Sequence, residues 1–197
     1  MLFIKGVRKL GNLYIALVHY PVLDNLGNEV TSSITSLDIH DISRSARTYG
    51  VSKYFIVHPS EIQRKFVERV VNHFVIGDGK NFNPDRGETL ELVEVLKSLE
   101  VVMKRITEME SKKPFLVTTT AKDHSTQISY DFLREKISKE PDPFLLVFGT
   151  SWGLSKKIVD NSDFVLSPLR SVKNLKYNHL SVRSASGIIL DKILGRN

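Results

Sequence analysis

The run FLLVF at 144–148 restricts the fold more than any other feature, because it has no polar side chain on either face. Such a strand fits the centre of a sheet that is covered on both sides. Other short apolar runs recur along the chain with helical patterns between them, and strands joined by helices form parallel sheets through crossover connections. The sequence therefore predicts an α/β fold, a parallel sheet of about six strands with helices on both faces. The expected strands are 13–18, 53–58, 92–96, 115–119, 144–148 and 164–167.

The helical pattern is clearest over 60–75, where a Ser60-x-x-Gln63 capping box precedes an apolar stripe. Similar patterns predict helices over 38–49, 98–110, 126–138 and 180–194. The segment GDGKNFNPDRGE (77–88) is dense in turn-forming residues and predicts a mobile loop or the boundary of a sub-segment. No repeat or long linker interrupts the chain, so residues 1–197 are expected to form a single domain. The stripe of 60–75 consists of Ile62, Phe66, Val67, Val70, Val71 and Phe74.

The composition is that of an ordinary globular protein, with 41% hydrophobic and 25% charged residues. The absence of cysteine excludes disulfides, thiolate catalysis and cysteine-rich zinc sites. The six histidines show no ligand spacing, so no metal is expected. The sequence has no signal peptide, and no apolar run approaches the roughly 20 residues of a membrane helix. We therefore expect a soluble, cytoplasmic protein that does not contact a membrane.

The positive charge is concentrated near the end of the chain. The net charge is +6, and the segment after residue 150 holds eight basic and three acidic residues, which is five of those six charges. A localised positive field favours a polyanionic partner, and nucleic acid is the commonest one. A basic surface that only maintains solubility is the alternative interpretation.

The glycine-rich stretch GTSWGL (149–154) places Ser151 in a G-x-S-x-G pattern, which is typical of the nucleophile elbow of serine hydrolases. A catalytic triad would need an acid and then a histidine later in the chain, and Asp160 or Asp163 followed by His179 would supply them. Three features argue against it: only 46 residues follow Ser151, the next segment is short and charged, and no HGGG-like run supplies an oxyanion donor. The hydrolase stays the weaker alternative.

The same stretch matches neither a P-loop nor a G-x-G-x-x-G fingerprint. It is better explained as a turn after a buried strand, where Gly149 and Gly153 let the backbone approach a ligand closely. Ligands of parallel α/β sheets bind beyond the carboxyl ends of the strands. We therefore expect the segments that follow each strand to line the site. The single tryptophan, Trp152, could cover the pocket, offer a base a stacking surface or simply pack.

Taken in order, these segments resemble the SPOUT, or α/β-knot, RNA methyltransferases over about 13–194. The resemblance rests on GTSWGL, on the proline-containing loop LSPLRS (166–171), on HLSVRSASGIIL (179–190) and on DIHDISRSARTYGV (38–51). In the last of these, Arg44-Ser45-Ala46 and Gly50-Val51 fall on the family's first motif. The chain departs from the family pattern at four positions. Asp38 and Ser181 each replace an asparagine, Arg183 replaces a serine, and Ser151 stands near the usual glutamate.

The resemblance implies a C-terminal trefoil knot over about 115–194 and transfer of a methyl group from S-adenosylmethionine to tRNA or rRNA by a homodimer. It implies catalytic roles for Arg44 and Asp38. Arg44, Arg170, Lys173 and Arg183 are expected to contact RNA. A non-catalytic RNA-binding module on a degenerate knot fold is the alternative, because several motif residues are replaced. The expected cofactor-binding residues are Thr118, Thr119, Thr120, Gly149, Thr150, Gly153, Leu166, Ser167, Pro168, His179, Leu180 and Ser181.

Overall fold

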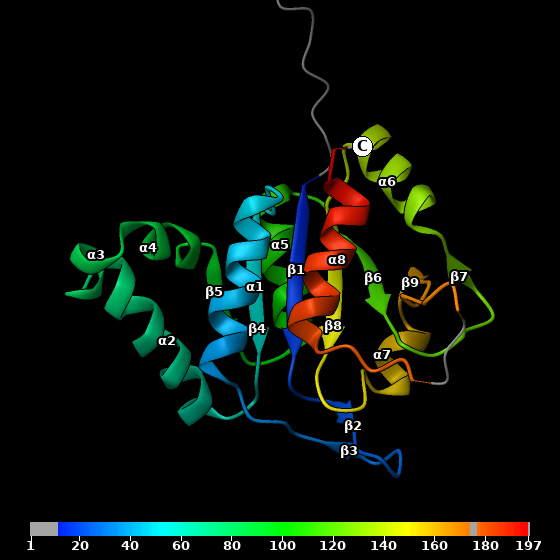
Figure 1. Cartoon of the computed structure of the whole chain (residues 1–197), viewed down its shortest axis with the longest axis horizontal. Helices are drawn as coiled ribbons and strands as arrows, with labels where there is room; N and C mark the ends of the chain where they lie inside the picture. Colours follow the sequence, from blue (N-terminus) through cyan, green and yellow to red (C-terminus); the bar gives the residue numbers. More distant parts are fainter. Residues whose placement is uncertain (1–11, 174–176, 197) are drawn as a thin grey trace, which may run out of the picture.

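The computed structural model describes residues 12–173 and 177–196 and shows a seven-stranded parallel sheet with helices on both faces (Figure 1). The strand order is β5-β4-β1-β8-β6-β9-β7. The predicted α/β class is confirmed, and all six predicted strands are present. The seventh strand, β7, lies at the start of the predicted helix 126–138. The strands are β1 (Leu13–Val18), β4 (Lys53–Val57), β5 (Val93–Leu96), β6 (Phe115–Thr119), β7 (Gln127–Ile128), β8 (Phe144–Gly149) and β9 (Phe164–Leu166).

The centre of the sheet is formed by β1 and β8, which are far apart in the sequence. Ala16 of β1 is in register with Phe55 of β4 on one side and Val147 of β8 on the other. All six residues of β1 and the first five of β8 are buried. The prediction that FLLVF is a central strand is therefore confirmed, and its apolar side chains on both faces are explained by cover on both sides.

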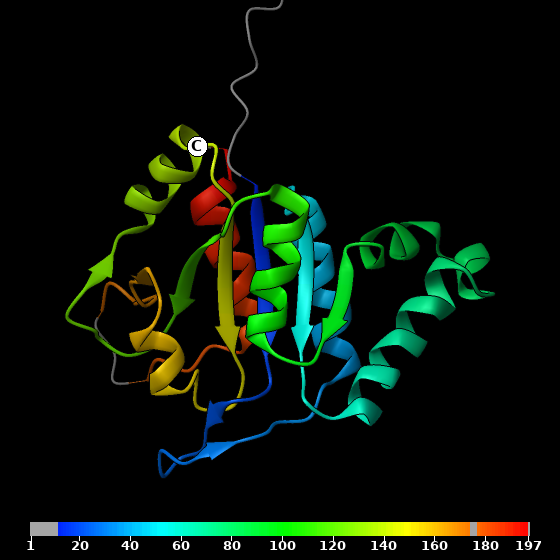
Figure 2. The same cartoon turned by 180° about the vertical axis from the view of Figure 1, so that it is seen from behind.

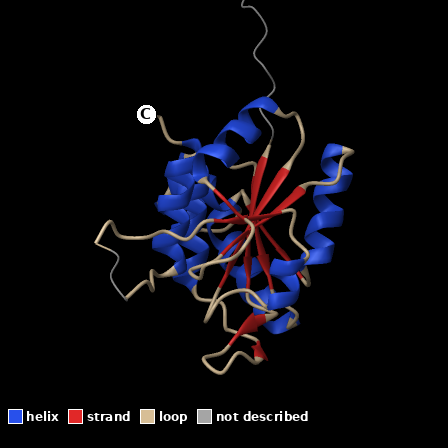
Figure 3. Ribbon diagram, turned by 90° about the vertical axis from the view of Figure 1, so that its right-hand side faces the viewer, coloured by secondary structure: helices blue, strands red, loops and turns tan. Residues whose placement is uncertain are grey.

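Two hydrophobic clusters lie on opposite faces of the sheet. Figure 3 shows helices on both sides of the strands. Among the described residues, five helices cover the face that carries the larger cluster. Helices α5 and α7 cover the opposite face, which Figure 2 shows from behind. The long helices agree with the predicted ranges to within a few residues. The helices of the larger face are α1 (Ser36–Thr48), α2 (Glu61–Val75), α4 (Pro84–Leu90), α6 (Tyr130–Lys139) and α8 (Val182–Leu194), and those of the other are α5 (Leu99–Glu110) and α7 (Lys156–Asp160).

The segment 77–88 is not the predicted loop. It forms α3 (Gly79–Phe82) and most of α4. Asn83 and Pro84 suggest a turn in sequence, but here they start a helix. The Asn83 side chain accepts a hydrogen bond from the Arg86 N–H. Pro84 stands at the first helical position, where a backbone N–H would have no partner within the helix, so the helix loses no hydrogen bond. Helix initiation and a turn use the same residue types, which is why the sequence pattern was misleading.

Helix α2 begins where predicted, but its capping box is absent. Ser60 is the N-cap residue without a side-chain cap bond, and the Gln63 Oε1 accepts a hydrogen bond from the Ile34 N–H at 2.9 Å instead. Its apolar stripe is also only partly buried. Val67 is buried, whereas Ile62 is 79% exposed. In Figure 1 α2 and α3 lie beyond the edge strand β5, so the sheet cannot cover the whole stripe.

A small hairpin missed by the sequence pattern is formed by β2 (Val22–Leu23) and β3 (Glu29–Val30). It lies beyond the carboxyl end of β1 (Figure 1) and pairs with the glycine turn. The Leu23 N–H donates to the Gly153 carbonyl at 2.9 Å, and the Trp152 N–H donates to the Leu23 carbonyl at 3.0 Å. Two-residue strands carry too little periodicity to be recognised in a sequence. This hairpin fixes the turn on which the candidate site is built.

Candidate functional site

A cleft of about 1070 Å³ opens at the carboxyl edge of the sheet, where ligands of parallel sheets bind. It is bounded by the glycine turn after β8, the loop after β6, the segment before α8 and the start of α1. Segments far apart in the sequence therefore meet here, as expected. Eight of the predicted cofactor-binding residues line the cleft: Thr119, Thr120, Gly149, Thr150, Gly153, His179, Leu180 and Ser181.

The other four predicted cofactor-binding residues are not among those that line the cleft. Thr118 is buried and its hydroxyl bonds to the Ser162 hydroxyl at 3.0 Å. Leu166 is fully buried, and the Ser167 hydroxyl donates to the Ile128 carbonyl at 2.8 Å. Pro168 also lies outside the lining, which resumes at Leu169 and Arg170. Strand β9 ends at Leu166, so its last side chains serve the sheet and the following loop reaches the cleft.

The glycine turn is held by close backbone packing. A side chain on Gly149 would meet the Leu154 nitrogen at 2.6 Å and the Gly153 carbonyl carbon at 2.9 Å, so that position requires glycine. Gly153 has φ +102°, a conformation that favours glycine, and the space where its Cβ would lie is open. Ser151 also has a positive φ, of 55°. At its two glycines the turn thus presents backbone to the cleft.

Ser151 is not placed like a hydrolase nucleophile. The helix that follows, α7, has only five residues, whereas an elbow serine caps a long buried helix. Within residues 12–173 and 177–196 the Ser151 hydroxyl has no hydrogen bond to a histidine or carboxylate. The candidate base of the triad, His179, contacts the Trp152 ring instead. The hydrolase alternative is therefore rejected.

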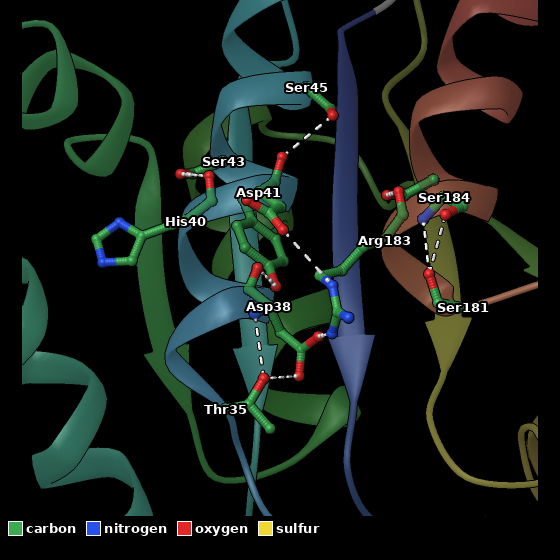
Figure 4. A network of polar contacts seen from close by, with 11 residues as sticks. Thr35, Asp38, His40, Asp41, Ser43, Ser45, Ser181, Arg183 and Ser184 are labelled. Atoms are coloured by element: carbon green, nitrogen blue, oxygen red, sulfur yellow. Dashed lines mark hydrogen bonds and ion pairs between the residues drawn. The ribbon is translucent and has the colours of Figure 1, made fainter.

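Asp38 and Arg183 form an ion pair at the cleft, joining α1 to α8 (Figure 4). The Arg183 Nη1 donates to Asp38 Oδ1 at 2.9 Å, and the Thr35 hydroxyl donates to Asp38 Oδ2 at 2.6 Å. The Arg183 Nε also lies 3.5 Å from Asp41 Oδ2. Asp38 is 5% exposed. A buried carboxylate is tolerated because a cation and a hydroxyl satisfy it.

Helices α1 and α8 each begin at an N-cap residue whose side chain bonds to the first turn. The Thr35 side chain accepts a hydrogen bond from the Asp38 N–H at 3.2 Å, and the Ser181 hydroxyl accepts one from the Ser184 N–H, also at 3.2 Å. These caps satisfy orphan donors of α1 and α8 and set where each helix begins. Asp38 and Arg183 both lie in the first turn of their helix, and the packing of α1 against α8 brings them together.

The remaining predicted basic residues are more exposed. Arg44 lies on an exposed face of α1, outside the cleft lining, and its guanidinium has no ion pair within the described parts of the chain. Arg170 lines the cleft and its Nη2 bonds to Asp123 Oδ2 at 2.8 Å. Lys173 is exposed. Arg183, predicted to contact RNA, has its guanidinium directed toward two carboxylates.

A buried histidine network behind the glycine turn was not singled out as a functional site in the sequence. The His19 Nδ1 lies 3.0 Å from the Ser32 hydroxyl, which bonds to the Thr150 hydroxyl. The Thr150 hydroxyl also bonds to the Val18 carbonyl, at 3.2 Å. His58 Nε2 lies 3.1 Å from the Ser32 carbonyl. His19 and His58 each directly follow a strand, β1 and β4, and that position was the signal available in the sequence.

His19 is neutral near pH 7. Its side chain is fully buried, and burial lowers the pKa of His19 to about 4, with a smaller opposing effect from the Asp38 charge. Burial also lowers the pKa of His58. The Nε2 of His19 has no hydrogen-bond partner in the described structure. The network therefore holds Ser32 and Thr150, both of which line the cleft, through a neutral imidazole.

Two further features bear on the site. Among residues 12–173 and 177–196 no group of three histidine or acidic side chains is arranged to hold a metal ion. Across the same ranges, no helix has the length and apolar character needed to span a bilayer.

The fold and the cleft are those of a parallel α/β protein, a class whose ligands bind at the carboxyl edge of the sheet. Solved structures with this fold include a probable methylase family protein of Haemophilus influenzae, with a TM-score of 0.60 and 16% identity over 93% of this chain and 65% of that one. Another is the SpoU methyltransferase AviRb of Streptomyces viridochromogenes in complex with AdoMet. Its TM-score is 0.57 and its identity 18%, over 94% of this chain and 57% of that one.

Residues 12–195 match the model of a SAM-dependent RNA methyltransferase family, and the chain belongs to that family. The SPOUT resemblance is thereby confirmed. The chain is 38% identical to an uncharacterized protein of Aquifex aeolicus, over 94% of this chain and 90% of that one. It is 40% identical, over 93% of its length, to a tRNA (guanine-N(1)-)-methyltransferase of Oleidesulfovibrio alaskensis, of which it spans only 42%. The protein is therefore an RNA methyltransferase that uses S-adenosylmethionine as its cofactor.

Proposed function

We propose that the cleft at the carboxyl edge binds S-adenosylmethionine and that an RNA nucleotide enters it to be methylated. The observation that carries this proposal is the glycine turn, in which Gly149 has no room for a side chain and Gly153 presents open backbone to a cleft of about 1070 Å³. That volume suits a ligand of nucleoside size. The residues assigned to the cofactor are the eight that line the cleft, whereas Thr118, Leu166, Ser167 and Pro168 support the loops behind them.

When bound, S-adenosylmethionine supplies an electrophilic methyl group. The residues of this chain then have to orient the acceptor and take up a proton. Asp38 is proposed to accept the proton, because its carboxylate lies at the cleft and is held in place by Arg183. Arg183 also offers a cation to a phosphate or to charge that develops on the acceptor. Arg44 is proposed to contact RNA phosphate from the exposed face of α1.

The RNA is proposed to be tRNA or rRNA. The net charge of +6, most of it carried after residue 150, supports a polyanionic substrate. Arg170 and Lys173 lie on exposed loops next to the cleft and suit phosphate contacts. The guanine-N1 activity in the relative's name belongs to a protein more than twice as long. It therefore does not specify the atom that this chain modifies.

A homodimer and a cytoplasmic location complete the proposal. The support for a dimer is the family resemblance together with exposed apolar side chains on the arm formed by α2 and α3, such as Ile62 and Phe82. The trefoil knot over about 115–194 is proposed on the similarity to SpoU structures. Sedimentation equilibrium would test the dimer, because a monomer at micromolar concentration would contradict it.

The decisive experiment combines calorimetric titration with S-adenosylhomocysteine and transfer of a labelled methyl group from S-adenosylmethionine to total tRNA and to ribosomal RNA. We expect micromolar binding that is lost in Gly149→Val, and label in one of the two RNA pools. Cofactor binding with no transfer to either pool would contradict the proposed substrates. RNA binding without cofactor binding would instead support the non-catalytic module.

A further inference from the structure

Three exposed rings lie together at the mouth of the cleft. The proposed function assigns His179 to the cofactor and gives the other two rings no role. Trp152 belongs to the glycine turn, and Tyr177 and His179 belong to the segment that leads into α8. The Trp152 and His179 ring centroids are 5.9 Å apart, and those of Tyr177 and His179 are 5.3 Å apart. Trp152 and His179 line the cleft. We call these three residues the aromatic cluster.

The rings of the aromatic cluster contact one another edge to face, and much of the surface of Trp152 and Tyr177 stays uncovered. The interplanar angles are 67° for Trp152 and His179 and 73° for Tyr177 and His179. Trp152 is 52% exposed and Tyr177 is 76% exposed. The same turn does bury a large side chain, because Leu154, two residues after Trp152, is only 5% exposed. Packing therefore does not explain why the largest side chain of the turn faces solvent.

The backbone that carries the rings is anchored on both sides of the cleft. The Trp152 N–H donates to the Leu23 carbonyl at 3.0 Å, which ties the turn to the β2–β3 hairpin. The Asn178 Nδ2 donates to the Ala121 carbonyl at 3.2 Å and so ties the segment between Tyr177 and His179 to the loop after β6. Because these segments are held in place, the aromatic side chains they carry lose less conformational freedom when a ligand binds.

Cations line the same cleft as the aromatic cluster. Lys122 and Lys156 are exposed there and form no ion pair within the described parts of the chain. Flat aromatic surfaces beside cations that are free to meet phosphate are the combination that binds single-stranded nucleic acid. A base within a duplex is stacked between its neighbours and cannot present its face to a side chain, whereas an unpaired base can.

We infer that Trp152, Tyr177 and His179 form a stacking platform for an unpaired base of the RNA at the mouth of the cleft. This inference rests on the proposed function and makes it more specific. The substrate is a single-stranded or looped RNA segment, and the platform holds a base while Lys122 and Lys156 hold the backbone. Duplex RNA would reach only the cations.

Trp152 allows a direct test, because it is the only tryptophan in the chain and reports its own surroundings by fluorescence. The probes are a mixed-sequence single-stranded RNA of about 12 nucleotides, within the usual site size for such proteins, and the blunt duplex of the same sequence. Both are titrated into protein saturated with S-adenosylhomocysteine. The single strand should quench Trp152 fluorescence and the duplex should not. Equal quenching by both RNAs, or by neither, would overturn the platform.

The variants separate stacking from stability. Trp152→Ala should weaken binding of the single strand by roughly 5- to 100-fold and leave duplex binding within about twofold. Trp152→Phe keeps an aromatic face and should restore most of the affinity. Phe132→Ala, which removes a 46% exposed ring of α6 that does not line the cleft, is the matched control and should change neither. A Trp152→Ala protein that binds the single strand as the unchanged chain does would refute the inference.

The same titrations distinguish this inference from the proposed function. If the unchanged protein binds no S-adenosylhomocysteine, the proposed function fails, and RNA quenching of Trp152 in the absence of that ligand still tests the platform. If Trp152→Ala abolishes binding of S-adenosylhomocysteine and leaves RNA binding unchanged, the ring serves the cofactor. The platform would then be wrong while the proposed function stands.

Discussion

The guanidinium of Arg183 is bonded to the carboxylate of Asp38 at 2.9 Å, and this contact joins α1 to α8, the first and last helices of the described residues. The two residues are 145 positions apart in the sequence. Asp38 takes the place of an asparagine, and Arg183 that of a serine, in the motifs of the family that the chain resembles. The two departures are thus in contact and compensate each other in charge.

Arg183→Met should destabilise the fold and abolish methyl transfer. The substitution leaves the buried carboxylate of Asp38 with Thr35 as its main partner, and removing one member of such a pair leaves an uncompensated charge. Because Arg183 is about one-third exposed, we expect a loss of about 2 kcal/mol in the free energy of unfolding, below the value for a fully buried pair. Urea denaturation would measure it.

Two further variants test whether the effect belongs to the pair. Adding Asp38→Asn to Arg183→Met should recover part of the lost stability, because no charge is then left buried. Lys65→Met breaks the exposed Lys65–Glu61 pair of α2 and should cost less than about 0.5 kcal/mol. An Arg183→Met protein as stable as Lys65→Met would show that the ion pair contributes nothing.

Gly149→Ala should distort the glycine turn. The added Cβ would meet backbone atoms of Gly153 and Leu154 at 2.6–2.9 Å, and backbone cannot move aside as a flexible side chain can. We expect a loss of about 1–3 kcal/mol in stability and at least tenfold weaker binding of S-adenosylhomocysteine in calorimetry. Gly187→Ala in α8 is the control. Its Cβ would lie 3.6 Å from the Ser45 hydroxyl, an ordinary contact, and alanine favours the helix. Equal behaviour of both variants would contradict the requirement for glycine at 149.

The stability of the protein should fall as the pH is lowered from about 6.5 to about 4. Burial lowers the pKa of His19 from 6.5 to about 4, so in that window the unfolded chain takes up a proton that the folded chain does not. The stabilisation is therefore present above pH 6.5 and lost as the pH falls toward 4, with a total of about 3 kcal/mol at most. Denaturation at a series of pH values would measure the slope.

Replacing His19 by asparagine should flatten that slope and leave the share contributed by His58, whose pKa burial also lowers. His19→Gln, which is longer, provides a second neutral side chain if the first variant folds poorly. A slope that is the same in the unchanged protein and in both variants would show that His19 does not titrate as its burial implies.

Ser151→Gly should leave methyl transfer unchanged and keep or raise stability by up to about 1 kcal/mol. The φ of 55° at Ser151 is strained for a residue with a Cβ and relaxed for glycine, although glycine also gains freedom in the unfolded chain. Thermal unfolding and the methyl-transfer assay would measure both effects. Labelling of the unchanged protein by a fluorophosphonate, lost in the variant, would contradict our rejection of Ser151 as a nucleophile.

The sequence alone determined the class of fold and the edge at which the site lies. An apolar run such as FLLVF fits the centre of a covered sheet, and parallel strands place all their carboxyl ends on one edge. The order of its motifs also indicated the family. These properties are local or depend only on chain order, so they can be read without coordinates.

Only the tertiary structure decided which side chains meet. It paired Asp38 with Arg183, removed Thr118 and Leu166 from the cleft, placed Arg44 outside it and turned 77–88 into helices. It also joined His19 to Thr150 through Ser32. Sequence spacing gives the face of an element that a residue occupies. The neighbour across that face depends on how elements distant in the chain pack, and burial then determines whether a polar group needs a partner.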